Sequence, residues 1–242
     1  MSEAIRSPSV AEARGVHRTF AGAAGGDIRV LRGVDLDIHA GETIAIVGPS
    51  GTGKSTLLHA LGGLDRPTSG TILLADRSLA GLNDSDLAEL RNRYVGFVFQ
   101  FHHLLRDFSA LENVMIPQLI AGRSSGDARG RARQLLDQVG LSHREGHRPN
   151  QLSGGEQQRA AVARALANEP PVLLADEPSG NLDIETSERL HEVLFSLADT
   201  HGTALVVVTH DLALAGRTDR MLQLSAGVLH PVDHDGETGT GD

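Results

Sequence analysis

The segment GPSGTGKS, Gly48 to Ser55, combines glycines, one lysine and one serine at a spacing that can bind phosphate. It fits G-x-x-x-x-G-K-[ST], in which glycines let several backbone N–H groups point at the β- and γ-phosphates. Lys54 would add a full positive charge, and Ser55 a hydroxyl ligand for Mg²⁺. We therefore predict a nucleotide-binding loop. Its predicted contacts are Gly48, Pro49, Ser50, Gly51, Thr52, Gly53, Lys54, Ser55 and Thr56.

Two adjacent carboxylates follow a second apolar run. The run VLLADE ends with Asp176 and Glu177, and ligands of open parallel sheets bind at the carboxyl ends of the strands. Asp176 is therefore placed to hold Mg²⁺, through water, while Glu177 is placed to polarise an attacking water as a general base. The alternative is that Asp-Glu-Pro only caps a strand and begins a turn.

Two further polar residues follow apolar runs in the same way. Gln100 comes after Val95 to Phe99, and His210 comes after Ala204 to Thr209. Each side chain is expected at the same sheet edge, within reach of the γ-phosphate, and Gln100 joins Ser55 and Asp176 as a predicted Mg²⁺ ligand. For His210 the alternative is a solvated or structural histidine, since the chain has 12.

The segment LSGGEQQR, Leu152 to Arg159, supplies a second glycine motif. Its residues Ser153, Gly154, Gly155 and Glu156 stand at the start of a predicted helix, which makes a second anion-binding helix terminus. The chain thus has two surfaces that attract phosphate but one phosphate loop. The alternative is an ordinary helix cap that contains glycine.

Alternation of strand and helix patterns predicts an α/β fold with right-handed crossovers. Continuous apolar runs, typical of strands buried on both faces of a parallel sheet, occupy Thr43 to Val47, Val172 to Ala175 and Ala204 to Val208. Short alternating strands at Arg29 to Ile38 and Thr71 to Leu74 indicate a small antiparallel layer. The predicted helices are Lys54 to Leu61, Asp84 to Arg93, Ala128 to Val139, Glu156 to Ala167 and Glu185 to Ala198.

Composition narrows the classes of partner. The 242 residues are 40% hydrophobic and 22% charged, which is typical of a globular chain. A net charge of -9, 3% aromatic residues and no Trp argue against a nucleic-acid partner. No run approaches the roughly 18 to 20 apolar residues of a membrane-spanning helix, and there is no signal-like segment and no cysteine. We expect a cytosolic protein with disordered ends at residues 1–14 and 231–242.

The motifs occur in an order that resembles the ATPase subunits of ABC transporters, from about Gly15 to His230. The landmarks are GPSGTGKS, Gln100, LSGGEQQR, VLLADE, the segment SGNLD (Ser179 to Asp183) and His210. The resemblance implies a P-loop NTPase (RecA-like) core with a small antiparallel β layer and an inserted helical subdomain at about 101–160. These would belong to one domain, residues 15–230, that uses ATP and Mg²⁺.

In that family two cassettes associate head to tail around two ATP molecules. The resemblance implies a dimer with a second copy of this chain, in which Ser153 and Gly155 contact the γ-phosphate bound by the partner and Asp183 couples the two sites. The aromatic residue that stacks on adenine is commonly Tyr in the family. The candidate here is Phe20, and the alternative is a Phe buried in the antiparallel layer.

Three shorter segments resemble one subgroup, the ATPase subunits of lipoprotein-releasing systems. They are LLHALGGLD (Leu57 to Asp65), FQFHHLLRDFSALENVMIP (Phe99 to Pro117) and HRPNQLSGGE (His147 to Glu156). Arg106 departs from the subgroup, where proline is more usual. The resemblance implies a peripheral protein at the cytoplasmic face of the inner membrane, permease partners of the LolC/LolE kind and a lipoprotein cargo. Macrolide-exporter ATPases and division-associated FtsE-like cassettes are the alternatives.

Overall fold

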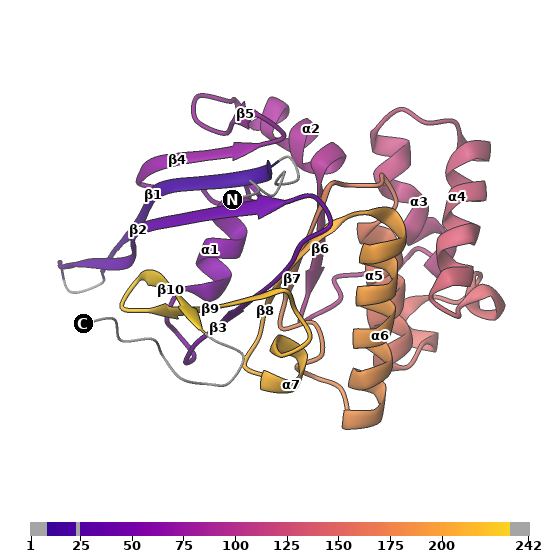
Figure 1. Cartoon of the computed structure of the whole chain (residues 1–242). Helices are drawn as coiled ribbons and strands as arrows, with labels where there is room; N and C mark the ends of the chain where they lie inside the picture. Colours follow the sequence, from indigo (N-terminus) through magenta and orange to yellow (C-terminus); the bar gives the residue numbers. More distant parts are fainter. Residues whose placement is uncertain (1–8, 23–24, 233–242) are drawn as a thin grey trace, which may run out of the picture. The chain divides into compact units, whose positions relative to one another are not determined.

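The computed structural model describes residues 9–22 and 25–232 (Figure 1). They form two compact units: unit 1 takes the described residues up to Leu87 and from Ala204, and unit 2 comprises Ala88–Thr203. Helix α2 (Asp84–Tyr94) crosses the division. The assignment of residues 15–230 to one domain with a helical subdomain at about 101–160 stays a prediction.

Unit 1 contains the expected antiparallel layer, with strand order β2-β1-β4-β5. Its strands are β1 (Ser9–Ala21), β2 (Asp27–His39), β4 (Ser69–Leu74) and β5 (Arg77–Ser78). The prediction of a disordered N-terminus through residue 14 is wrong for residues 9–14, which belong to β1, while residues 1–8 lie outside the described part. Ala11, Ala13 and Val16 are at most 2% exposed and alternate with outward residues. Small alanines give that alternation little hydrophobic contrast in the sequence.

Unit 1 also contains four strands that position the phosphate loop, in the order β10-β9-β3-β8. Strands β3 (Thr43–Val47) and β8 (Ala204–Val208) have the predicted bounds and pair in parallel, as do β3 and β9 (Arg220–Ser225). Strand β10 (Val228–Val232) pairs antiparallel with β9. This hairpin was not predicted, and it takes residues 231–232, which the sequence prediction had placed in a disordered tail. Residues 233–242 of that tail lie outside the described part.

Two helices complete unit 1. Helix α1 (Lys54–Leu61) has the predicted bounds and packs against β1, β2, β4 and β8. Leu57, Leu58 and Leu61 are at most 1% exposed, so α1 is fixed by its apolar face. The short helix α7 (Leu212–Ala215) contacts β3. Both helices therefore contact the strands whose ends carry predicted site residues.

Unit 2 combines two parallel strands with a group of helices. Strands β6 (Val95–Phe99) and β7 (Val172–Asp176) pair so that Phe99 lies opposite Asp176. The long helices are α3 (Ala110–Ile120), α4 (Ser125–Gln138), α5 (Gly154–Ala165) and α6 (Ile184–His201), with 3-10 turns at Ser142–Arg144 and Pro149–Gln151. Helix α5 contacts α3, α4, α6 and β6, so it is central to unit 2.

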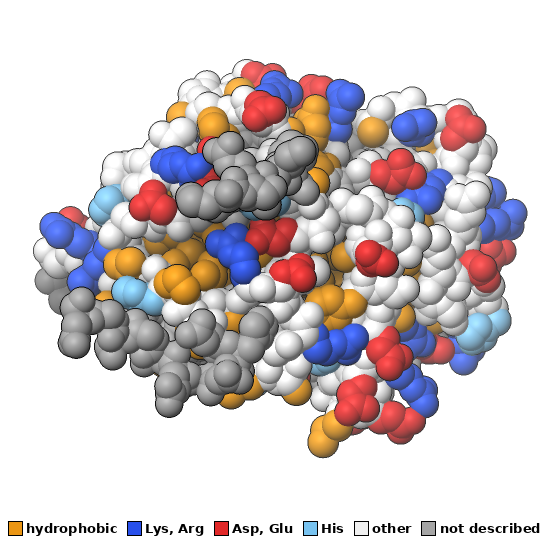
Figure 2. All heavy atoms as spheres, in the orientation of Figure 1, with side chains coloured by type: hydrophobic (Ala, Val, Ile, Leu, Met, Phe, Trp, Pro, Cys, Tyr) orange, Lys and Arg blue, Asp and Glu red, His pale blue; other side chains and the backbone are white. Residues whose placement is uncertain are grey.

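The helix predictions in this region agree with the structure within three residues at each end, except that α3 was not predicted. Its start carries a capping box between Ser109 and Glu112, but Pro117 lies inside the helix, which is unusual for helical sequences. On the described part of the face in Figure 2, acidic and basic side chains are interspersed. Within residues 9–22 and 25–232, no helix has both the length and the hydropathy to cross a membrane.

Candidate functional site

The phosphate loop lies in unit 1 between β3 and α1. Gly48 and Gly53 have φ angles of 148° and 102°, which L-residues rarely adopt. A Cβ atom at Gly53 would lie 2.5 Å from Cγ1 of Val30, and one at Gly48 would lie 2.7 Å from the carbonyl oxygen of Leu224. The conformation of the loop and its close neighbours therefore both require glycine at these positions.

The start of α1 has two features that suit a phosphate. Gly53 is the N-cap of α1 and has no side chain that can accept from the first N–H groups of the helix. Lys54 is 7% exposed, and its Nζ donates to the carbonyl oxygens of Gly48 at 2.9 Å and Pro49 at 3.0 Å. Lys54 is also the only lysine among the 242 residues. A buried ammonium beside an uncapped helix start favours an anion.

Within unit 1, His210 follows strand β8 at the same edge of the sheet at which the phosphate loop follows β3. Strands β3 and β8 pair Ile46 with Val208, and the N–H of Thr209 donates to the carbonyl of Ile46 at 3.2 Å. His210 follows at once and is exposed. The expectation that His210 ends its strand at the edge that carries the phosphate loop is therefore met within this unit.

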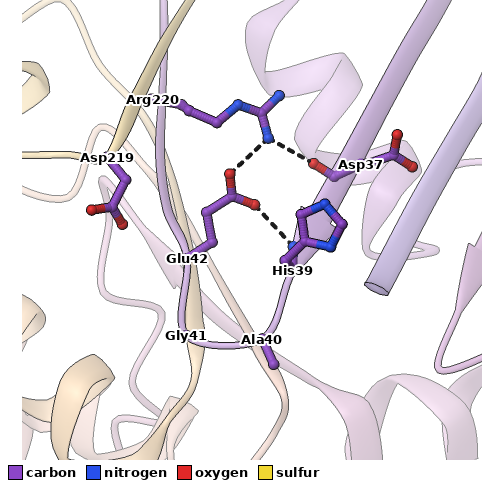
Figure 3. A pocket seen from close by; sticks show the side chains of 7 residues that line it. All are labelled: Asp37, His39, Ala40, Gly41, Glu42, Asp219 and Arg220. Carbon is purple, nitrogen blue, oxygen red and sulfur yellow. Dashed lines mark hydrogen bonds and ion pairs between the residues drawn. The ribbon is translucent and has the colours of Figure 1, made fainter. Parts of the chain in front are cut away.

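Residues that sequence reasoning missed hold the start of β3. Asp219 accepts from the backbone N–H and the hydroxyl of Thr43, both at 2.8 Å. Arg220 forms an ion pair with Glu42 at 2.7 Å and donates to the carbonyl of Asp37 at 3.1 Å (Figure 3). These groups line a cavity of about 570 Å³ that includes no predicted site residue. Arg220 is paired with Glu42, and Asp219 is bonded to Thr43, so these groups tie β9 to the start of β3.

Phe20 lies on β1 and is 38% exposed, which removes the alternative of a buried Phe. The guanidinium carbon of Arg18 lies 4.3 Å from the centroid of its ring. Arg18 is itself held by Asp65, to which its Nε and Nη2 donate at 2.7 Å each. A ring that is fixed on one side and partly exposed remains able to stack on a planar group.

Unit 2 brings Gln100 close to the segment that follows the acidic pair. Because Phe99 lies opposite Asp176, Gln100 and Glu177 follow at neighbouring strand ends. Nε2 of Gln100 donates to Oδ1 of Asn181 at 3.4 Å, and Nδ2 of Asn181 donates to the carbonyl of Gln100 at 3.3 Å. Asn181 was not singled out from the sequence, and its place within SGNLD was the available signal.

Glu177 has a strained backbone. Its φ is 44°, in the left-handed region, and its carbonyl accepts from the N–H of Gly180 at 3.0 Å. A turn therefore begins at Glu177, as the alternative of a strand cap followed by a turn also predicts. Non-glycine residues in this region cost about 1 to 3 kcal/mol and cluster at functional sites, so the strain also favours a functional role for Glu177.

Ser153 begins α5 with a capping box. Its hydroxyl oxygen accepts from the N–H of Glu156 at 3.2 Å, and its own N–H donates to Oε2 of Glu156 at 2.8 Å. That backbone N–H, and Arg144 at 3.1 Å, hold the pKa of Glu156 below its usual value. Ser153 and Gly154 are exposed, while Gly155 is buried. The single chain thus shows the ordinary cap, with the motif still accessible from outside.

The segment around Asp183 lies against this motif. Asp183 caps α6, where it accepts from the N–H of Thr186 at 2.9 Å and from its hydroxyl at 2.8 Å. These two bonds lower the pKa of Asp183. A Cβ atom at Gly155 would lie 2.3 Å from Cγ2 of Thr186. The glycine therefore permits the contact between α5 and the start of α6.

Comparison with known proteins decides the family. A family model described as "ABC transporter" matches residues 31–180. The chain belongs to the ABC transporter family. This ABC ATPase is 54% identical to the lipoprotein-releasing system ATP-binding protein LolD of Idiomarina loihiensis, over 85% of the chain and 91% of that protein. It is 55% identical to LolD of Geobacter metallireducens, over 83% of the chain and 89% of that protein.

Solved structures give the same fold. A dimeric, post-hydrolysis ATP-binding cassette bound to ADP and Pi matches with a TM-score of 0.83 at 39% identity, over 90% of this ABC ATPase and 96% of that chain. The cassette cbiO1 from Clostridium perfringens, part of the transporter complex cbiONQ, matches with a TM-score of 0.80 at 26% identity. The predicted fold class, an α/β P-loop NTPase, and the predicted ATPase activity are confirmed.

The contact at Gly155 predicts a position-specific loss of stability. Gly155→Ala should lower the free energy of unfolding by about 1 to 3 kcal/mol, because the new methyl overlaps Cγ2 of Thr186. Gly154→Ala is the matched control, since its Cβ would lie 3.5 Å from the nearest atom, in Leu182. Denaturant unfolding measures both.

A second substitution tests the cause. Thr186→Ser removes Cγ2 but keeps the hydroxyl that donates to Asp183, so it should restore most of the stability that Gly155→Ala loses. Equal stabilities for Gly154→Ala and Gly155→Ala, or no recovery with Thr186→Ser, would contradict the assignment.

Proposed function

We propose that this chain is the ATP-hydrolysing subunit of a lipoprotein-releasing ABC transporter, which detaches outer-membrane-directed lipoproteins from the inner membrane. The observation that carries the proposal is the 54 to 56% identity to proteins named LolD over at least 83% of the chain. No specific observation favours the alternative functions, a macrolide-exporter ATPase or an FtsE-like regulatory cassette. The co-purification experiment below distinguishes them from lipoprotein release.

ATP binding is assigned to unit 1. Backbone N–H groups of the phosphate loop and of the first turn of α1 would donate to oxygens of the β- and γ-phosphates. The ammonium of Lys54 would exchange its two carbonyl partners for phosphate oxygens. Thr56 follows on the same turn. The partly exposed ring of Phe20 is proposed to stack on adenine.

Hydrolysis is assigned to residues at strand ends. Glu177 would take a proton from the attacking water, and its strained backbone supports that role. Gln100 and His210 would orient the water and the γ-phosphate. Hydroxyl, amide and carboxylate oxygens suit Mg²⁺, so Ser55, Gln100 and Asp176 are the proposed ligands. When bound, Mg²⁺ would neutralise charge on the phosphate oxygens.

We further propose that two copies of the chain sandwich two ATP molecules. Ser153, Gly154, Gly155 and Glu156 would face the nucleotide bound by the partner, and the exposure of Ser153 and Gly154 in the single chain supports this. Asp183 would couple the two sites. ATP binding would then close the pair, and hydrolysis would reopen it.

The membrane partners are proposed to be permease subunits of the LolC/LolE kind. The helical subdomain, about residues 101–160 within a domain of residues 15–230, would contact them. Its exposed apolar side chains Phe101, Leu105 and Phe108 support such a contact. The chain would then lie at the cytoplasmic face of the inner membrane as a peripheral protein, with no role in nucleic-acid binding.

Co-purification tests the cargo system. The full-length chain, tagged and expressed in its own organism, should bring down two related permease subunits with bound lipoprotein when membranes are solubilised. Mass spectrometry of the retained proteins identifies them. Recovery of one division-type membrane partner, or of a drug-exporting permease without lipoprotein, would refute the lipoprotein proposal while leaving the ATPase assignment intact.

The single lysine permits a direct test of the phosphate loop. An amine-specific reagent can label only Lys54 and the N-terminal amine, so labelling at Lys54, followed by peptide mass spectrometry, should be suppressed by ATP. Lys54→Ala should weaken ATP binding at least tenfold, roughly the 1.5 to 3 kcal/mol of a charged hydrogen bond. Arg77→Ala, in exposed β5, is the control. Undiminished binding by Lys54→Ala would contradict its phosphate role.

Glu177→Gln tests the general base. Turnover should fall by about 10² to 10⁴-fold, because a general base contributes that much, while ATP binding persists. The ATP-bound dimer should accumulate and be detected by light scattering. Glu192→Gln, on the exposed face of α6, should keep full turnover. Normal turnover in Glu177→Gln would refute the assignment.

A further inference from the structure

Helix α5 carries two side chains, Gln158 and Arg164, that the proposed ATP site does not use. Both donate hydrogen bonds to backbone carbonyls on either side of Gln100. All of these residues belong to unit 2. The helix that begins at the exposed Ser153 is therefore the same helix that holds residues 99–103, which we call the Gln100 loop.

Gln158 holds the near side of that segment. It is 2% exposed, and its Nε2 donates to the carbonyl of Phe99 at 2.7 Å. Phe99 is the last residue of β6 and lies opposite Asp176. Loss of this donor would leave the Phe99 carbonyl without its α5 partner at the point where the strand becomes the loop.

Arg164 holds the far side. Its Nη1 donates to the carbonyl of His103 at 2.7 Å, and its Nη2 donates to that of His102 at 2.8 Å. Burial lowers the pKa of Arg164, and among residues 9–22 and 25–232 it forms no ion pair. A half-buried guanidinium held by two carbonyls gains no charge pairing from them, so its geometric contribution is to fix those carbonyls.

The two anchors lie on either side of a bend in the chain. Gln100 and Phe101, the two residues between Phe99 and His102, are both at bends. His103 has a φ of 47°, and its ring packs edge-on against Phe99 at 5.3 Å. The chain thus turns back after Gln100 and Phe101, the two residues between the anchors, and Phe101 is 65% exposed.

We propose that Gln158 and Arg164 are positioning residues that fix the Gln100 loop to α5. They would keep Gln100 in a constant position relative to Ser153, at the start of α5, during hydrolysis. The proposal rests on the proposed role of Gln100 at the γ-phosphate. Neither side chain is among the proposed ATP contacts. Gln158 and Arg164 act through Gln100, whose own contacts reach Asn181.

The test is a double-mutant cycle on the full-length chain. Arg164→Lys keeps the charge but loses the fork that spans two carbonyls, so it should lower kcat by about 10 to 100-fold through misplacement of Gln100. The dissociation constant for ATP should change less than about twofold, since the phosphate loop is untouched. Arg133→Lys, an exposed arginine on α4 paired with Glu145, is the matched control and should keep kcat.

The cycle separates positioning from general stability. In a Gln100→Ala background, Arg164→Lys should cause no further loss of kcat, because the group it positions is gone. An equal loss of kcat in both backgrounds would assign Arg164 a merely structural role and overturn the proposal. If Arg164→Lys does not fold, the same cycle is run with Gln158→Met, which removes the donor and keeps the volume.

Failure of the proposed function looks different. If Gln100→Ala alone leaves kcat unchanged, the proposed role of Gln100 is wrong, and so is the proposal that Arg164 and Gln158 act through Gln100. If Gln100→Ala lowers kcat but neither Arg164→Lys nor Gln158→Met does, only the positioning proposal is overturned.

Discussion

Helix α1 begins without a side-chain cap, and the proposed ATP site depends on that feature. The other helices with a described cap, α3 to α7, have a serine or an aspartate whose side chain accepts from their first N–H groups. At α1 the N-cap is Gly53, and the next residue is a buried lysine. N–H groups without a side-chain cap and an ammonium favour an anion, and we propose that the triphosphate of ATP supplies it.

Glycine is also what makes this start possible. A side chain at Gly53 would meet Val30 on β2, and one at Gly48 would meet the backbone of β9. The loop is therefore confined between β2 and β9, and Asp219 and Arg220 in turn fix β9 to the beginning of β3. The geometry of the phosphate loop thus depends on residues at the opposite end of its strand.

The sequence predicted the elements that have a strong local pattern. For β3, β8 and α1, the bounds predicted from continuous apolar runs and from the glycine motif equal the observed bounds. Strand β1 was not predicted because its buried positions are largely alanine. Helix α3 was not predicted because Pro117 is unusual inside a helix. Gln158 and Arg164 could not be found, since their partners are backbone carbonyls about 60 residues away, which no side-chain pattern reveals.

The two units divide the chemistry. Unit 1 holds the phosphate loop and His210, so it carries the groups that are proposed to bind the triphosphate. Unit 2 holds Gln100, Glu177 and the Ser153 motif. Contacts join the segments that carry them: Asn181 with Gln100, Thr186 with Gly155, and α5 with the Gln100 loop. Packed groups of this kind shift between discrete arrangements rather than deforming gradually. A change at Gln100 would therefore reach the start of α5, where the partner's nucleotide is proposed to bind.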